Sequence, residues 1–337
     1  MLTRSSRQTD LQIRPLQYRD LDAVERLCGE GELDGVSSAP CSMVQQQQPV
    51  KLSRWYGLLR SFGWLPHPWR AALSMYVAEF GHRVRGVIRV SPFNHTRSTW
   101  RVDQIAVESA IFESKEGVTT VATASDMGTA LLRYCLENIW QASTWLLELD
   151  VNDQDALGLY RQNGFQLLAQ MTYWSFSAQK LREVADREPD LPNLQPVSNA
   201  DAQLLYQLDN MAMPPLVRQV FDRHPQDFKT SLLQSLVALV RQWVSQTETV
   251  SGYVFETQRK VAIGHFQLRL CKDGSQPHQA QLTVHPAYTW LYPELIVQMA
   301  RIVQDVPEQS LQIVSADYHR SGRNSWRRWG PIGLPIR

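Results

Sequence analysis

The sequence has few of the local patterns that identify common functional classes. Its four cysteines include no C-x-x-C pair, so neither a zinc knuckle nor a dithiol redox centre can form from neighbouring positions. No stretch reaches the ~18 consecutive apolar residues that a membrane-spanning helix requires, and the polar segment 1–10 lacks the apolar core of a secretory signal. We therefore expect a cytoplasmic protein.

Charge of neither sign is in excess. The chain has 34 Lys and Arg against 33 Asp and Glu, a formal net charge of +1. Because so balanced a surface does not attract phosphate backbones as a whole, we expect no nucleic-acid partner. The eight histidines show no metal-ligand spacing and no neighbouring Ser or Cys in a nucleophile pattern, so we expect no metal centre and no catalytic triad.

The chain does have enough apolar material for folded domains. Hydrophobic residues make up 43% of its 337 positions, which is in the range of globular proteins. At roughly 150 residues per domain, the length indicates two domains. The charged segment 179–192 contains Pro189 and Pro192 and is typical of a linker. We therefore predict domains over 11–178 and 193–330.

The first domain alternates strand and helix patterns. Asp20 precedes apolar residues at helical spacing, and Asn163-Gly164 ends another helical pattern as a left-handed stop. The predicted elements are a strand over 11–16, a helix over 20–27, a hairpin over 75–90, a strand over 100–107, a helix over 128–140, a strand over 145–151, a helix over 154–162 and a strand over 171–176.

The second half repeats part of the first. The pattern over 13–27 returns at one constant offset over 194–208, with Asp20 matched by Asp201. The run Gln104-Ile105-Ala106-Val107 is similarly matched by Gln281-Leu282-Thr283-Val284. Two diverged copies of one unit would explain both matches.

The segment 147–165 carries the most specific pattern. An apolar strand is followed by Asn152, then by Ala156, Tyr160 and a closing Gly164-Phe165. This order and spacing resemble the fifth strand and fourth helix of the GCN5-related N-acetyltransferase (GNAT) superfamily. With Ala156 and Tyr160 aligned, the Asn of the superfamily falls on Asp153, and Asn152 lies beside it. The resemblance covers about residues 11–176 well and 193–330 faintly.

Two further stretches are similar to the acyl-CoA motif of that superfamily, which is normally a Gln/Arg-x-x-Gly-x-Gly/Ala loop. They are the strand end Ile105-Ala106-Val107 and the helix opening Gly128-x-Ala130. The resemblance implies an α/β (α+β) fold of two GNAT-like lobes. Each lobe would be a mixed, mostly antiparallel twisted sheet flanked by helices, and the C-terminal lobe would be a degenerate copy.

The resemblance also implies an activity and the residues for it. The chain would be an acyl-CoA-dependent N-acyltransferase that moves an acyl group, with acetyl expected, from acetyl-CoA directly to an amine of a small molecule or a protein. Tyr160 matches the general acid that protonates the departing thiolate. A helix N-terminus led by glycine suits a diphosphate. The expected cofactor-binding residues are Ile105, Ala106, Val107, Met127, Gly128, Thr129, Ala130, Leu131 and Asn152.

Some features depart from the superfamily pattern. Ser125 stands where the motif has Gln or Arg, and the connection from Val107 to Gly128 is much longer than usual. Both departures favour an alternative, a non-catalytic binding or regulatory module of the same fold. Tyr160 has an alternative as well, as a buried aromatic side chain of the core.

Other candidate residues have more ordinary interpretations. Asp103, Glu79 and Glu108 border the expected acceptor cleft, but each is typical of a solvated surface carboxylate, and we assign no general base. The basic, aromatic segment 51–70 would wall that cleft, although its composition would also suit contact with a membrane surface. The arginines at 320, 323, 327 and 328 are typical of a solvated helix face.

The second copy lacks the features that carry the resemblance. It has no glycine at the position matching Gly128, and it places Trp326 where the first copy has Tyr160. An indole N–H is too weak an acid to protonate a thiolate, so we expect the second copy to bind no acyl-CoA. No pattern in the sequence identifies the acceptor amine or the oligomeric state.

Overall fold

A computed structural model describes residues 11–30, 74–108, 110–115, 118–229 and 246–318. The chain divides into two compact units, Met1–Gln166 and Leu167–Arg337, which we call the first and second unit and describe separately. The predicted helix within 51–70, the C-terminal arginines and Trp326 lie outside the described residues.

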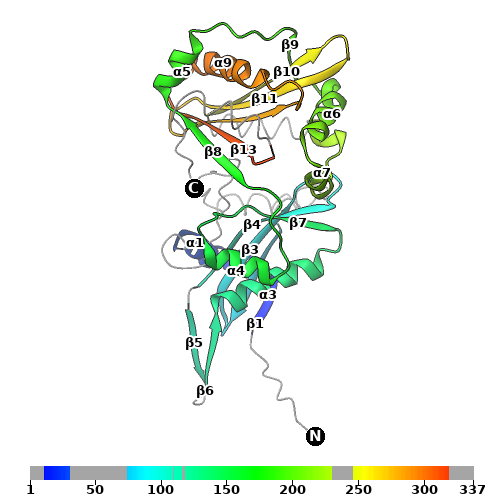
Figure 1. The fold of residues 1–337 in the computed structure, drawn as a ribbon. Coiled ribbons are helices and arrows are strands. Elements are labelled where there is room, and N and C mark those ends of the chain that lie inside the picture. The colour runs from blue at the N-terminus through cyan, green and yellow to red at the C-terminus, as the bar shows by residue number, and fades with distance from the viewer. Residues whose placement is uncertain (1–10, 31–73, 109, 116–117, 230–245, 319–337) are drawn as a thin grey trace. The chain divides into compact units, whose positions relative to one another are not determined.

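The first unit is built on a mixed sheet with the strand order β1-β2-β3-β4-β7 (Figure 1). Its strands are β1 (Leu11–Pro15), β2 (Ser74–Phe80), β3 (Arg83–Pro92), β4 (Thr99–Val107) and β7 (Thr144–Leu146). The first four pair antiparallel, and β7 pairs parallel with β4. Gly81 and His82 both have positive φ angles, as the turn of a tight hairpin requires, and the predicted hairpin is confirmed.

Helices cover both faces of this sheet. Side chains of α3 (Ala124–Asn138) and α4 (Gln154–Gln162) pack with Ile88 and Ile105 on one face. On the other face, α1 (Leu21–Glu30) packs its Val24 and Leu27 against Val87 and Ala106. The two faces are therefore distinct, and we call them the α3 face and the α1 face.

A β-hairpin fills the long connection between β4 and α3, where the sequence shows no periodicity. It consists of β5 (Ala110–Lys115) and β6 (Val118–Thr123). Ala110 pairs with Thr123 across its base. Because Ala110 closely follows β4 and Thr123 directly precedes α3, the hairpin returns the chain to the end of β4, where α3 begins.

The second unit contains a six-stranded sheet with the order β8-β13-β12-β11-β10-β9 (Figure 1). Its strands are β8 (Met171–Phe176), β9 (Leu194–Pro196), β10 (Thr247–Glu256), β11 (Val261–Cys271), β12 (His278–Val284) and β13 (Leu311–Ala316). Only β12 and β13 pair parallel, as β4 and β7 do in the first unit. The helix α9 (Leu291–Val303) lies between them in the chain, at the place of α3.

The two segments matched by the sequence offset fold alike. In each, a short strand leads through a 3-10 turn, η1 (Tyr18–Asp20) or η2 (Asn199–Asp201), into a helix, which is α1 or α6 (Ala202–Ala212). Each turn is closed by its aspartate, since Asp20 accepts a 2.8 Å hydrogen bond from the Gln17 N–H and Asp201 accepts one from the Ser198 N–H. The hydrogen bonds from Arg14 also hold the pKa of Asp20 below its usual range.

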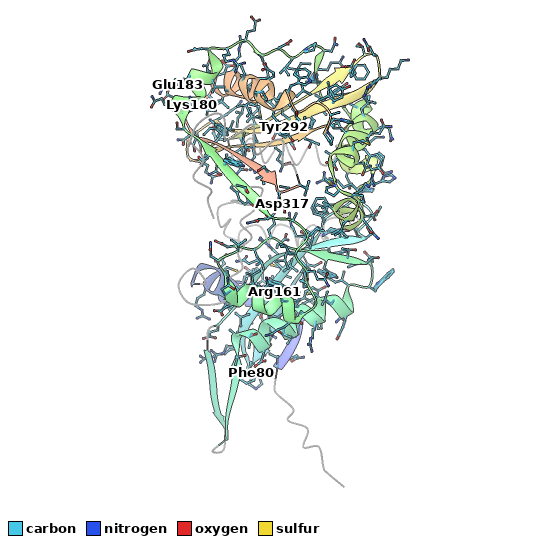
Figure 2. All side chains as sticks on the ribbon, viewed as in Figure 1. Phe80, Arg161, Lys180, Glu183, Tyr292 and Asp317 are labelled. Carbon is cyan, nitrogen blue, oxygen red and sulfur yellow. The ribbon has the colours of Figure 1, made fainter. Side chains whose placement is uncertain are left out.

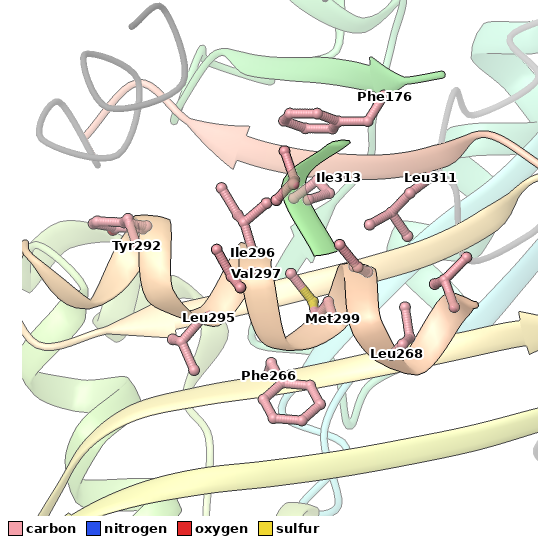
Figure 3. Close-up of a cluster of buried hydrophobic side chains, with 14 of the residues drawn as sticks. Phe176, Phe266, Leu268, Tyr292, Leu295, Ile296, Val297, Met299, Leu311 and Ile313 are labelled. Atoms are coloured by element: carbon pink, nitrogen blue, oxygen red, sulfur yellow. The ribbon is translucent and has the colours of Figure 1, made fainter. Parts of the chain in front are cut away.

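The boundary between the predicted domains needs correction. The strand β8 was predicted to end the first domain, but it pairs antiparallel with β13 of the second unit. The predicted linker contains the helix α5 (Ala178–Ala185), which carries Lys180 and Glu183 on its surface (Figure 2). Its Leu181 and Val184 are buried in the same core as Phe176, Ile296 and Ile313 (Figure 3). The sequence pattern did not predict this helix, because the segment is charged and followed by prolines and only one face of the helix is apolar.

None of the helices in the described part of the chain has the length and apolarity that crossing a membrane requires.

Candidate functional site

β4 and β7, the last two strands of the first sheet, pair over only part of the length of β4. β4 pairs with β7 only from Thr99 to Arg101, against Thr144 to Leu146. Beyond this point β4 continues to Val107 with β3 on one side. In the described residues, no strand pairs with the other side of β4 over 102–107. This part of β4 is therefore an open edge of the sheet, which we call the open edge of β4.

Two backbone amides face this open edge. The Glu108 N–H donates to the Arg85 carbonyl at 2.9 Å, so Glu108 and Arg85 form a hydrogen-bonded pair. Because antiparallel pairs alternate, the N–H groups of Ala106 and Gln104 also point toward β3. Those of Ile105 and Val107 must then point the other way. The side chains of Ile105 and Val107 are buried on the α3 face, so their backbone groups are what they present at the open edge.

The helix α3 begins earlier than predicted, at Ala124. Gly128 lies in its second turn, where the N–H of a helical residue is bonded within the helix. A Cβ at Gly128 would lie 3.0 Å from Leu159 Cδ2, so this glycine allows α3 to pack closely against α4. Met127 and Leu131 are buried, and Thr129 Oγ1 accepts a hydrogen bond from Asn163 of the α4 C-terminus. The diphosphate cradle over 127–131 stays a prediction, and the packing of Met127, Gly128 and Leu131 in the core does not favour it.

The true N-terminus of α3 carries a carboxylate. Thr123 caps the helix by accepting a 3.1 Å hydrogen bond from the Asp126 N–H, and its hydroxyl donates to Asp126 Oδ2 at 2.7 Å. If Gly128 is the second small residue of the acyl-CoA motif, then Asp126 takes the place of the first glycine. Thr123 then takes the place of Gln or Arg. The spacing Thr123-x-x-Asp126 is a capping pattern that could have predicted this start.

The helix α4 presents two of the predicted site residues. Asp153 caps it by accepting a 2.9 Å hydrogen bond from the Ala156 N–H, which leaves Asn152 as the exposed residue of the pair. Tyr160 is only 3% exposed. Its ring packs edge-on against that of Phe165, with 5.5 Å between the ring centroids. The next residue, Arg161, lies on the exposed side of α4 (Figure 2). Tyr160 thus belongs to the core on the α3 face, in the same cluster as Ile105 and Val107 of β4.

Of the three carboxylates that the sequence predicted to be solvated, Asp103 and Glu79 are instead largely buried. Asp103 is only 3% exposed and accepts hydrogen bonds at Oδ1 from Arg101 Nε, 2.7 Å, and Ser91 Oγ, 3.0 Å. Glu79 accepts a 2.9 Å hydrogen bond from Arg14. Glu108 is half-exposed and pairs with Arg85. Ion pairing explains the burial of Asp103 and Glu79, because a carboxylate leaves water only with compensating partners.

Among the residues that the structure describes, no three His, Cys, Asp or Glu side chains lie close enough to hold a metal ion.

The second unit repeats the strand separation but differs at its helix. β12 and β13 pair only over His278 to Ala280. At the start of α9, the Leu291 N–H donates to Tyr288 and the Tyr292 N–H donates to Thr289, while Pro293 has no N–H. Leu291 and Tyr292 are buried, and burial raises the pKa of Tyr292 to about 12. The backbone donors that an anion would need are already used.

Comparisons with known proteins agree with this architecture. No family model and no curated protein matches the chain. A solved tandem GNAT protein from the clavulanic acid biosynthesis pathway is 14% identical, with a TM-score of 0.53 over 96% of this chain and 95% of that one. A GCN5-related N-acetyltransferase from Sphaerobacter thermophilus is 14% identical, with a TM-score of 0.47 over 95% and 91%. The first similarity shows that the chain has the fold of the GNAT superfamily.

Proposed function

We propose that the first unit is an N-acyltransferase that moves an acyl group, in the first instance acetyl, from CoA to an amine. The observation that carries this proposal is the open edge of β4. An extended pantetheine chain can add to such an edge as a further strand does. The fold supports the same class of activity, since the similar solved protein from the clavulanic acid biosynthesis pathway is named as a tandem GNAT protein.

Three residues of the first unit would each have a different role in acyl transfer. The Val107 N–H points to where a thioester carbonyl would lie and would stabilise the negative charge that develops on its oxygen. Tyr160 supplies a hydroxyl that can donate a proton to the departing thiolate. Asn152 remains exposed at the start of α4 and can bind the pantetheine chain. The acyl group would pass directly from the thioester to the acceptor nitrogen.

The diphosphate of CoA fits the structure less well. The Ala124 and Ser125 amides at the start of α3 have no partner within the helix, as in any helix, and could bind an anion. The Asp126 carboxylate in the same turn is already stabilised by that helix end and repels a second anion there. We therefore expect CoA to be held mainly through its pantetheine part.

Removal of the Asp126 charge is expected to tighten acetyl-CoA binding. Two unit charges ~4 Å apart repel by about 1 kcal/mol in water, which corresponds to about fivefold in affinity. Asp126→Asn keeps an acceptor for the Thr123 hydroxyl, and Asp155→Asn in the first turn of α4 is the matched control. Calorimetric titration measures both. An unchanged affinity in Asp126→Asn would place the diphosphate away from α3.

The same carboxylate supports a second candidate function, a non-catalytic module that keeps the fold without turnover. The two functions differ in one assay, the release of free thiol from acetyl-CoA in the presence of amines. A panel that includes amino acids, neutral amines, polyamines and peptides should yield amine-dependent thiol release for an acyltransferase. Thiol release at the rate of buffer alone with every amine would favour the module.

A further inference from the structure

A polar cluster lies on the α1 face of β3 and β4, next to the open edge. It consists of Arg89, Ser91, Arg101 and Asp103. The pairing register shifts here, since Arg89 pairs with Gln104 but Val90 pairs with Val102. Asp103 is the extra residue of this β-bulge, and bulges commonly redirect a side chain beside a functional site. The neighbouring α1-face positions, such as Val87 and Ala106, are apolar and buried.

The cluster has one more positive charge than negative. Arg101 Nε contacts Asp103 Oδ1 at 2.7 Å and matches its charge. Arg89 Nε lies 3.9 Å from Asp103 Oδ2, beyond hydrogen-bond distance, and this buried nitrogen has no hydrogen-bond partner among the residues that the structure describes. The Arg89 side chain is nevertheless 26% exposed, so part of its guanidinium can be reached. Among the described residues, Arg89 therefore shares its carboxylate, Asp103, with Arg101, and a half-buried arginine of this kind is suited to an anionic ligand.

The position of the cluster relates it to the proposed chemistry. Arg101 is the last β4 residue paired with β7, so Asp103 lies where the two strands separate. Arg89 is level with Gln104, and Val107 follows three residues later along β4. At ~3.4 Å per residue this is about 10 Å, the span of a small molecule. One acceptor could therefore contact Arg89 and still bring its amine to the open edge.

We propose that Arg89, supported by Arg101, binds a carboxylate of the acceptor. The inference rests on the proposed acyltransferase function and assigns its substrate class as amino acids rather than neutral amines or polyamines. A guanidinium binds a carboxylate through two parallel N–H donors, which fixes the direction in which the rest of the molecule points. Polyamines would bring a second positive charge toward Arg89 and are disfavoured.

The test compares acceptors that differ only in this charge. The full-length chain is assayed for thiol release from acetyl-CoA with 4-aminobutyrate and 4-aminobutanamide, and with β-alanine and β-alaninamide. We expect kcat/KM to be about 10–100-fold higher for each acid, the usual worth of hydrogen bonds between charged groups. Arg89→Gln should remove the preference. Arg182→Gln, on the exposed surface of α5, is the matched control and should retain it.

Two readouts separate this inference from the function on which it rests. Equal kcat/KM for acid and amide would overturn the inference and leave the acyltransferase standing. Calorimetric titration of the same pairs onto the chain without acetyl-CoA needs no turnover. Binding of the acid alone, lost in Arg89→Gln and partly kept in Arg89→Lys, would support the inference even if no thiol were released. Equal binding of acid and amide, or binding of neither, would contradict it.

Discussion

Tyr160→Phe is expected to lower kcat for acyl transfer by about 10²–10⁴-fold, the usual contribution of a positioned general acid. Tyr160 is 3% exposed and packs edge-on against Phe165. Phenylalanine preserves this contact and removes only the hydroxyl, so the affinity for acetyl-CoA should change little. The loss should therefore fall on kcat rather than on KM.

Tyr134→Phe provides the matched control for this variant. Tyr134 lies on α3, and its ring packs against that of Tyr76 with 5.2 Å between the ring centroids. This variant therefore also removes a hydroxyl from a packed ring. Its kcat should equal that of the unaltered chain. A Tyr160→Phe variant with full activity would show that Tyr160 is a packing residue and that the leaving thiolate takes its proton elsewhere.

The second large effect is expected at the open edge of β4. Val107→Pro removes the N–H that we propose as the hydrogen-bond donor to the thioester carbonyl. Loss of such a donor costs about 10²–10³-fold in kcat. This N–H points away from β3, so the ladder between β3 and β4 should survive. The neighbouring variant Ala106→Pro removes an N–H that points toward β3 and should instead lower the melting temperature.

The pair of proline variants distinguishes chemistry from folding. Val107→Pro should melt close to the unaltered chain and lose transfer, whereas Ala106→Pro should lose stability. If Val107→Pro destabilised the first unit as much as Ala106→Pro, the Val107 amide would be part of the sheet. If it folded and remained fully active, another donor would have to stabilise the thioester oxygen.

Local patterns were sufficient to predict much of the first unit. The β2-β3 hairpin, the helix α4 and its stop at Asn163-Gly164 follow from periodicity and turn residues that lie within a few positions of one another. The repeat was visible for the same reason, since the turns at Asp20 and Asp201 are closed by hydrogen bonds three residues apart. Their geometry depends on nearby residues alone.

The errors arose where distant residues decide the outcome. Nothing in the sequence of β8 shows that its partner is β13, about 140 positions away. Asp103 is buried because Arg101 and Ser91 compensate its charge, which no hydrophobic pattern records. Gly128 was predicted to bind phosphate, and no pattern in the sequence showed that a Cβ there would lie 3.0 Å from Leu159 of another helix. The role of a glycine depends on what approaches it.

Calorimetric titration of the full-length chain with acetyl-CoA tests directly whether the first unit holds a single acetyl-CoA site. The open edge of β4 and the free start of α3 lie in the first unit. The corresponding start of α9 has its donors occupied and includes Pro293. We expect one acetyl-CoA bound per chain, with the stoichiometry unchanged in Asp126→Asn. Two bound molecules would contradict the assignment of a single site, and no binding would contradict the acyltransferase itself.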